Sequence, residues 1–278
     1  MKLHPDSARP LAYSVVIPFF NEAPNVARLL EEVRCAMDAL GGEYEVLCVD
    51  DGSTDTTGAE LGRIEEVWAR CRVIELAGNQ GQAAALLAGL GTARGEVLIT
   101  MDGDGQNDPA DIPRLLARLK GCDMVAGVRA RREDSPLRRV MSRLANGVRS
   151  RFLRDGVSDT GCALKAFRRE VAGAFLPIRT LYSFMPALTV AAGFRVAEHP
   201  VNHRPRTAGA SKYGLRAMLW RPLLDMLGVW WFIQRRVRIH RAKPQDYGVK
   251  QWPSLATRNP QLDTPEGAIF PTAAPLHR

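Results

Sequence analysis

The sequence predicts an α/β fold with a mostly parallel central sheet and helices on both faces. Short apolar runs bounded by turn residues alternate with stretches in which apolar residues recur at helical spacing. Three of the runs lead directly into acidic loops. Alternating strands and helices are typical of parallel sheets with right-handed crossovers.

The predicted elements follow this alternation along the chain. The first strand ends at Pro18, and Gly41 closes the helix after it. The second helix is expected to turn Leu61, Ile64, Val67 and Trp68 inward. The predicted strands are 13–17, 44–49, 72–76, 97–100, 124–127, a strand that follows Gly161, and a strand pair over 195–201; the remaining predicted helices are 26–40, 82–93 and 181–193.

Length and composition indicate one large globular domain with appendages. The chain has 278 residues, of which 46% are hydrophobic and 24% charged. The first ten residues are polar, so no signal peptide is expected. The odd number of cysteines, their apolar surroundings and the absence of a C-x-x-C spacing favour a reducing cytoplasm; they are Cys35, Cys48, Cys71, Cys122 and Cys162.

The net charge of +8 predicts anionic partners. Nine arginines fall between Arg129 and Arg154, and a second basic cluster, 235–243, follows the apolar, aromatic stretch 219–234. This order favours an anionic membrane surface. A nucleic-acid partner is not expected, because the arginines are not interleaved with stacking aromatic residues.

The stretch 101–106 is the strongest candidate for a functional site. It follows the strand 97–100 and places Asp102 and Asp104 two residues apart, while Gly103 and Gly105 permit the chain to turn. Carboxylate oxygens suit Mg²⁺ or Mn²⁺, which bind through one or two carboxylates together with substrate phosphates. The alternative is an ordinary surface turn, for which Asp and Gly are also favoured.

A parallel sheet brings three acidic loops to one edge. These loops are 21–22, 50–51 and 102–104, and each follows a strand of the same polarity. A nucleotide fits this arrangement, because a carboxylate accepts hydrogen bonds from ribose hydroxyls while a metal neutralises the diphosphate. The dinucleotide fingerprint G-x-G-x-x-G is absent from the first turn, which argues against NAD.

Four ordered segments, 14–22, 49–55, 81–89 and 101–106, resemble the successive signatures of family 2 glycosyltransferases. The subgroup that the chain resembles most is the dolichyl- or polyprenyl-phosphate sugar transferases. The resemblance covers residues 14–231. It implies a GT-A fold, a GDP- or UDP-hexose donor, and Mg²⁺ or Mn²⁺ as cofactor.

The reaction predicted from this resemblance is inverting transfer of a mannose- or glucose-type hexose to a polyprenyl phosphate. The metal ligands expected are Asp102, Asp104 and Gln106. The residues expected to bind the donor are Pro18, Asn21, Glu22, Asp50, Asp51, Asp102, Gly103, Gln106 and Arg206. Arg129 and Lys212 are expected to stabilise the charge that develops on the leaving diphosphate.

Arg138 and Ser142 stand four residues apart on one helical face, where together they can hold a phosphate. The resemblance implies that this is the phosphate of the acceptor. Arg139 and Arg143 have the same spacing one step round the helix. For Arg143 and for three further arginines, a solvated helix face is the preferred interpretation; the three are Arg149, Arg151 and Arg154.

Asp159 is expected to orient the reacting groups, since a phosphate acceptor is already ionised and needs no base. Two alternatives stay open. With a hydroxyl acceptor Asp159 becomes the catalytic base, and as a simple turn residue it caps Gly161. For the protein as a whole, a more distant alternative is a non-catalytic membrane-surface binding protein that keeps the fold.

The predicted organisation is a tail at 1–12, a catalytic domain at 13–214, a membrane-surface helix region at 215–243, and an extended tail at 244–278. The uncharged stretch 181–193 is too short to cross a bilayer, which needs about 20 residues, and is expected to be a buried helix. For 219–234 a helix in the headgroup plane and a core helix are both open. The expected location is the cytoplasmic face of the membrane, with peripheral attachment.

Overall fold

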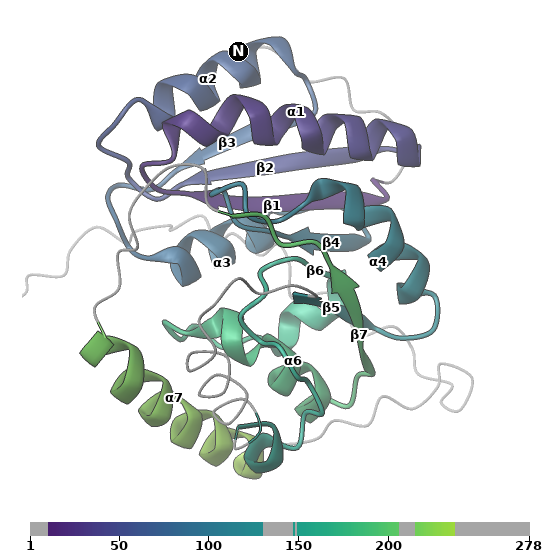
Figure 1. The fold of residues 1–278 in the computed structure, drawn as a ribbon, viewed down its shortest axis with the longest axis vertical. Coiled ribbons are helices and arrows are strands. Elements are labelled where there is room, and N and C mark those ends of the chain that lie inside the picture. Colours follow the sequence, from purple (N-terminus) through teal and green to yellow (C-terminus); the bar gives the residue numbers. More distant parts are fainter. Residues whose placement is uncertain (1–10, 130–146, 148, 206–214, 237–278) are drawn as a thin grey trace, which may run out of the picture. The chain divides into compact units, whose positions relative to one another are not determined.

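The structure, a computed structural model, describes residues 11–129, 147, 149–205 and 215–236 (Figure 1). Its elements are β1 (Tyr13–Phe19), α1 (Ala23–Leu40), β2 (Tyr44–Asp50), α2 (Thr57–Val67), β3 (Cys71–Glu75), α3 (Gln82–Thr92), β4 (Val97–Thr100), a 3₁₀ turn (Pro109–Asp111), α4 (Ile112–Leu119), β5 (Met124–Arg129), β6 (Lys165–Arg168), a second 3₁₀ turn (Arg169–Ala174), α6 (Leu181–Ala191), β7 (Val196–Val201) and α7 (Leu215–Arg235).

The strands form one seven-stranded sheet in the order β3-β2-β1-β4-β6-β5-β7. Among the described strands, only β6 runs antiparallel to its neighbours, β4 and β5. The predicted mostly parallel sheet is therefore confirmed. The strand pair expected over 195–201 is wrong: the segment forms the single strand β7, which pairs in parallel with β5.

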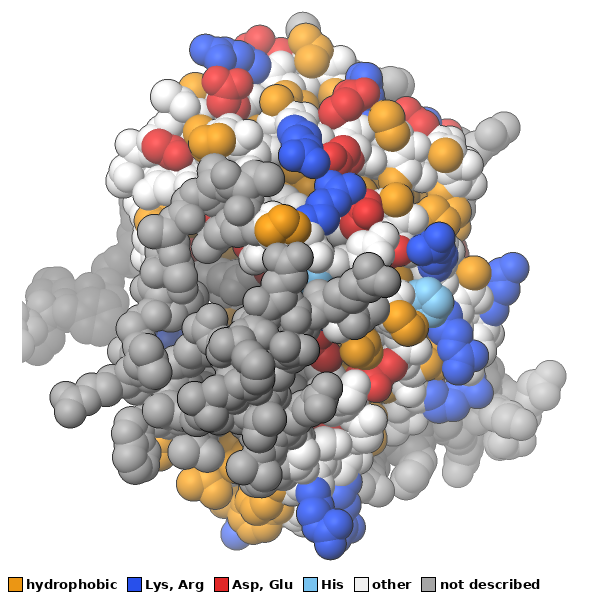
Figure 2. All heavy atoms as spheres, in the orientation of Figure 1, with side chains coloured by type: hydrophobic (Ala, Val, Ile, Leu, Met, Phe, Trp, Pro, Cys, Tyr) orange, Lys and Arg blue, Asp and Glu red, His pale blue; other side chains and the backbone are white. Residues whose placement is uncertain are grey.

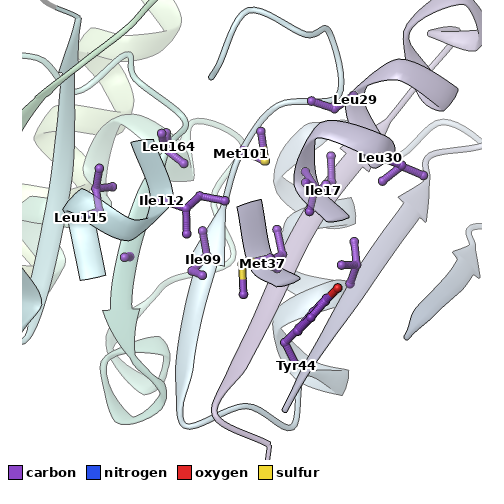
Figure 3. Close-up of a cluster of buried hydrophobic side chains, with 14 of the residues drawn as sticks. Ile17, Leu29, Leu30, Met37, Tyr44, Ile99, Met101, Ile112, Leu115 and Leu164 are labelled. Atoms are coloured by element: carbon purple, nitrogen blue, oxygen red, sulfur yellow. The ribbon is translucent and has the colours of Figure 1, made fainter. Parts of the chain in front are cut away.

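Helices cover both faces of the sheet because alternate strand residues point to opposite sides. Val15 and Ile17 of β1 belong to a core that includes residues of α1, α2 and α4, part of which Figure 3 shows. Val16 belongs to a second core with residues of α3, α6 and α7. The buried helix expected over 181–193 is confirmed by α6, which contributes Phe184 and six other buried residues.

Two expectations about side chains are wrong. Val67 is 84% exposed, because α2 ends there and Trp68 continues in extended backbone. Trp68 itself packs edge-on against Tyr44, with ring centroids 6.5 Å apart. Cys35 is exposed rather than in apolar surroundings, and its thiol faces the Glu31 carboxylate on the outer side of α1.

Candidate active site

The carboxyl ends of β1, β2 and β4 lie at one edge of the sheet. Phe19 stands opposite Asp50 in the β1–β2 register, and the Asp51 N–H donates to the Phe19 carbonyl at 2.9 Å. The turn after β4 approaches the same place: a Cβ at Gly103 would lie 2.8 Å from the Pro18 carbonyl oxygen. A side chain at position 103 would therefore collide with β1.

The first two loops are joined by hydrogen bonds around Asn21. This residue has a positive φ of 54°, and its side-chain oxygen accepts the Thr54 N–H at 2.7 Å. Its own N–H donates to Ser53 Oγ at 3.0 Å, and that hydroxyl donates to Asp50 Oδ1 at 2.5 Å. Asn21 and Asp50 therefore shape one continuous polar surface.

Glu22 lies beside this surface and is buried. Its backbone N–H donates to Thr57 Oγ1 at 2.9 Å. Its carboxylate accepts the Asn25 side-chain amide at 2.7 Å. Glu22 thus holds the start of α1 against the start of α2.

Asp51 holds the start of α3. Its two carboxylate oxygens accept the backbone N–H groups of Gln80 at 2.7 Å and Gly81 at 2.9 Å. The next residue, Gln82, donates its side-chain amide to Asp102 Oδ1 at 2.5 Å. A chain of contacts thus connects the loop after β2, through α3, to the carboxylate after β4.

Asp102 and Asp104 form the electrostatic centre of the site. Burial and the neighbouring Asp104 carboxylate raise the pKa of Asp102 to about 7, against the opposing influence of Lys165, Gln82 and Arg129. Asp104 Oδ1 accepts the Gln106 N–H at 3.1 Å. Two carboxylates that repel each other in a half-buried turn form a donor set that a divalent cation would stabilise.

Lys165 acts electrostatically on Asp102 and is completely buried. It stands opposite Thr100 in the β4–β6 register, and its ammonium group donates to the Cys162 carbonyl. Burial lowers the pKa of Lys165, while Asp102 and Asp159 act in the opposite direction. The Tyr182 ring lies 5.5 Å from its Nζ.

Arg129 and Asp159 form a two-pronged ion pair. The Arg129 Nε and Nη2 groups each donate to one oxygen of Asp159 at 2.8 Å, and both side chains are mostly buried. Asp159 also accepts the Gly161 N–H at 3.1 Å, as expected of a turn aspartate. A Cβ at Gly161 would lie 2.7 Å from Arg129 Nη2, so glycine leaves room for the pair.

The segment that carries Asp159 is held by two further contacts. The Glu198 carboxylate of β7 accepts the Ser158 N–H at 2.7 Å. Arg149 is buried and pairs with Asp155, and it also donates to the Val157 carbonyl at 2.9 Å. The expectation that Arg149 lies on a solvated face is therefore wrong, because its side chain forms a buried ion pair with Asp155.

The segment after β7 supports the turn that contains Gln106. The Arg204 N–H donates to the Gln106 carbonyl at 2.9 Å. The Arg204 side chain pairs with Glu32 at 2.5 Å and with Asp108 at 2.8 Å. Four residues with predicted roles lie outside the described part of the chain: Arg138, Ser142, Arg206 and Lys212.

Sequence reasoning assigned no role to Gln82, Lys165 or Glu198. The sequence could have indicated a role for Lys165, because a lysine within the apolar run 162–167 must find compensating charge when the strand is buried. For Gln82 and Glu198 the sequence offers no such indication, because each bonds to a residue that is far away in the sequence.

Comparison with known proteins places the chain in one family. Residues 14–175 match the family described as glycosyl transferase family 2. The chain belongs to glycosyl transferase family 2. The expected family and the enzyme class, a glycosyltransferase, are thereby confirmed, and the reading as a non-catalytic binding protein is not supported.

Two known proteins are similar to most of the chain. The chain is 37% identical over 239 residues to a dodecaprenyl-phosphate galacturonate synthase from Rhizobium johnstonii, covering 84% of this chain and 70% of the relative. It is 40% identical over 209 residues to an undecaprenyl-phosphate 4-deoxy-4-formamido-L-arabinose transferase from Edwardsiella ictaluri, covering 74% and 64%. The chain thus spans about two thirds of these relatives' lengths.

Solved structures of similar fold are GT-A glycosyltransferases, which confirms the expected fold class. A mannosyltransferase from Pyrobaculum calidifontis in complex with GDP-mannose and Mn²⁺ has a TM-score of 0.60 at 22% identity, covering 84% of this chain and 66% of that one. Glucosyl-3-phosphoglycerate synthase from Mycobacterium tuberculosis with Mn²⁺, UDP-glucose and phosphoglyceric acid has a TM-score of 0.60 at 18% identity, covering 79% of each chain.

Proposed function

We propose that this glycosyltransferase moves a sugar from a nucleoside diphosphate to a polyprenyl phosphate, by one in-line displacement with inversion at the anomeric carbon. The two relatives are named for such acceptors, dodecaprenyl and undecaprenyl phosphate. Their sugars are a uronic acid and a formamido-pentose, so the donor sugar is not restricted to the mannose or glucose type expected from the sequence.

The metal that the fold family implies fits Asp102 and Asp104. Among the described residues no three Cys, His, Asp or Glu side chains gather as a metal site. A pair of carboxylates completed by substrate phosphates is the usual arrangement for Mg²⁺, and Gln106 follows in the same turn. A divalent ion held there would supply Lewis acidity toward the diphosphate. Mutual repulsion of the two carboxylates supports this assignment.

The donor is assigned along the same edge of the sheet. We assign the nucleoside to Asp50 and the turn 18–22, at the ends of β1 and β2. Asn21 and Asp51 already bond within the protein, so their proposed part is to shape this surface. Arg206 and Lys212 keep their proposed role at the diphosphate.

Asp159 is proposed to orient Arg129 rather than to take a proton. Both of its oxygens accept hydrogen bonds from the Arg129 guanidinium, and a carboxylate engaged in this way is a poor base. Arg129 is in turn held where it can offset charge that develops on the phosphates. Arg138 and Ser142 are proposed as ligands of the acceptor phosphate.

Attachment to an anionic membrane surface is supported by α7. In the described part of the chain, no helix is both long and apolar enough for a membrane span. Val229 packs into the core, while four large apolar side chains of α7 are exposed: Leu224, Leu227, Trp230 and Trp231. Figure 2 shows hydrophobic side chains gathered where α7 lies. Tryptophans beside basic residues are typical of helices in the headgroup plane.

The observation that carries the proposal is the meeting of the Asp50 loop and the Asp102–Asp104 turn at one edge of the sheet. The test offers UDP-glucose, UDP-galacturonic acid, a UDP-linked formamido-arabinose and GDP-mannose, each with undecaprenyl phosphate and Mg²⁺ or Mn²⁺. We expect one donor to deliver sugar to the lipid phase. Transfer only to a glycan or lipid hydroxyl would contradict the proposed acceptor.

A further inference from the structure

We propose that the Tyr182 hydroxyl binds a hydroxyl group of the donor sugar. This inference rests on the proposed function, because it takes the nucleotide sugar as the substrate of the site. It adds a residue that fixes which sugar is accepted.

The Tyr182 hydroxyl oxygen is buried and makes no hydrogen bond of ordinary geometry with any described residue. A buried polar group left in this state costs about 1–3 kcal/mol. Such groups are uncommon in folded proteins and need a specific reason. A bound ligand that supplies the missing hydrogen bond is one such reason.

The surroundings of this hydroxyl place it at the active site. The Asp102 carboxylate acts electrostatically on Tyr182, and the Gln82 side-chain amide lies close enough to the Tyr182 hydroxyl to interact weakly with it. The Gln82 amide itself is committed to Asp102 by a 2.5 Å hydrogen bond. The buried Lys165 ammonium lies 5.5 Å from the centre of the ring, within reach of a cation–π interaction. The Tyr182 ring therefore lies beside Lys165, and its hydroxyl lies near Asp102 and Gln82 without a hydrogen bond of ordinary geometry to a described residue.

The order of the strands indicates which part of the donor reaches Tyr182. The sheet runs β2-β1-β4-β6 across the site. The nucleoside is proposed at the ends of β2 and β1, and the diphosphate with its metal at the turn after β4. The sugar then extends toward β6, which carries Lys165 and contacts Tyr182 through it.

The chemistry of a phenol agrees with this position. A neutral hydroxyl is a weaker phosphate ligand than arginine or lysine, and Mg²⁺ and Mn²⁺ prefer carboxylate oxygens. A hydroxyl that can both donate and accept matches a sugar hydroxyl, which has the same two capacities.

The test is Tyr182→Phe, which removes the oxygen and keeps the ring. We measure kcat/KM for the donor identified in the panel, and binding of the matching free nucleoside diphosphate with Mn²⁺. We expect kcat/KM to fall about tenfold, as for a lost hydrogen bond of roughly 1.4 kcal/mol, while binding of the nucleoside diphosphate is unchanged. Tyr44→Phe is the matched control, because it also removes a tyrosine hydroxyl. In the wild type that hydroxyl bonds to Asp38 at 2.6 Å.

Donors that lack single hydroxyls identify the partner. With the wild-type enzyme, kcat/KM for one deoxy donor should be lower than for the full donor by about the same factor as the Tyr182→Phe substitution causes. With that deoxy donor, Tyr182→Phe should lower kcat/KM no further. Unchanged kcat/KM in Tyr182→Phe, an equal loss of nucleoside diphosphate binding, or additive losses for every deoxy donor would each overturn the inference. Failure of wild type to use any nucleotide sugar would instead refute the proposed function.

Discussion

The proposed metal-binding role of Asp104 can be tested directly by substitution. Its carboxylate is one of only two at the turn after β4, and it raises the pKa of the other by repulsion. Asp104→Asn keeps the shape and removes the charge. We expect transfer and metal-dependent donor binding to be lost together, measured by sugar in the lipid phase and by calorimetry with Mn²⁺. Normal turnover would end the metal assignment.

Asp102 should make metal binding depend on pH. Its pKa of about 7 lies above the usual value, so the carboxyl is protonated below pH 7 and ionised above it. Protons therefore compete with the metal at low pH. Titration of the donor-free enzyme with Mn²⁺, followed by electron paramagnetic resonance, should show affinity falling about tenfold per pH unit below about 7. A flat profile between pH 5.5 and 8 would contradict this prediction.

Asp159 distinguishes the two classes of acceptor. If the acceptor is a phosphate, Asp159→Asn should lower kcat by about tenfold, because the substitution disturbs only the orientation of Arg129. A base for a hydroxyl acceptor would cost about 10²–10⁴-fold. Thermal unfolding is measured alongside, since the substitution weakens a mostly buried ion pair. A loss of several orders of magnitude in a folded variant would favour the hydroxyl acceptor.

At the scale of elements, α3 packs closely on the sheet through Gly89. A Cβ at this position would lie 2.4 Å from Val16 Cγ1 and 3.0 Å from Val49 Cγ2. Gly89→Ala should lower the free energy of unfolding by about 1–3 kcal/mol, as overpacked cores do. Urea denaturation followed by circular dichroism measures it.

Gly91 provides the control within the same helix. A Cβ there would meet no atom within 4 Å. Gly91→Ala should leave stability unchanged or raise it by roughly 0.5–1 kcal/mol, the helical preference of alanine over glycine. If both substitutions destabilise equally, close packing of α3 on β1 is not the cause.

At the scale of the whole molecule, a net charge of +8 and the exposed face of α7 together predict binding to anionic vesicles. The double substitution of Leu227 and Trp231 by serine should weaken co-sedimentation with phosphatidylglycerol vesicles on the order of tenfold, because both side chains lose apolar burial.

Val67→Ser is the matched control for this experiment. Val67 is 84% exposed on α2, which packs into the other core of the sheet from the one that contains α7. Its substitution should leave vesicle binding unchanged. Equal loss in both variants, or binding that does not depend on lipid charge, would count against α7 as the membrane surface.

The sequence by itself determined the alternation of strands and helices, and with it the common edge of the three acidic loops. Both follow from local spacing and from the fixed direction of parallel strands. It also placed α6 in the core, because an uncharged stretch of that length has few other environments.

Only the tertiary structure decided the partners across the sheet. The Arg129–Asp159 pair, the Gln82–Asp102 bond and the Ser158–Glu198 bond each join elements that the spacing of residues does not connect. The insertion of antiparallel β6 between β4 and β5 brings Lys165 beside Thr100 and close enough to Asp102 to act on its pKa. Such contacts depend on strand order, which is set by packing of the whole chain and leaves no periodic trace in the sequence.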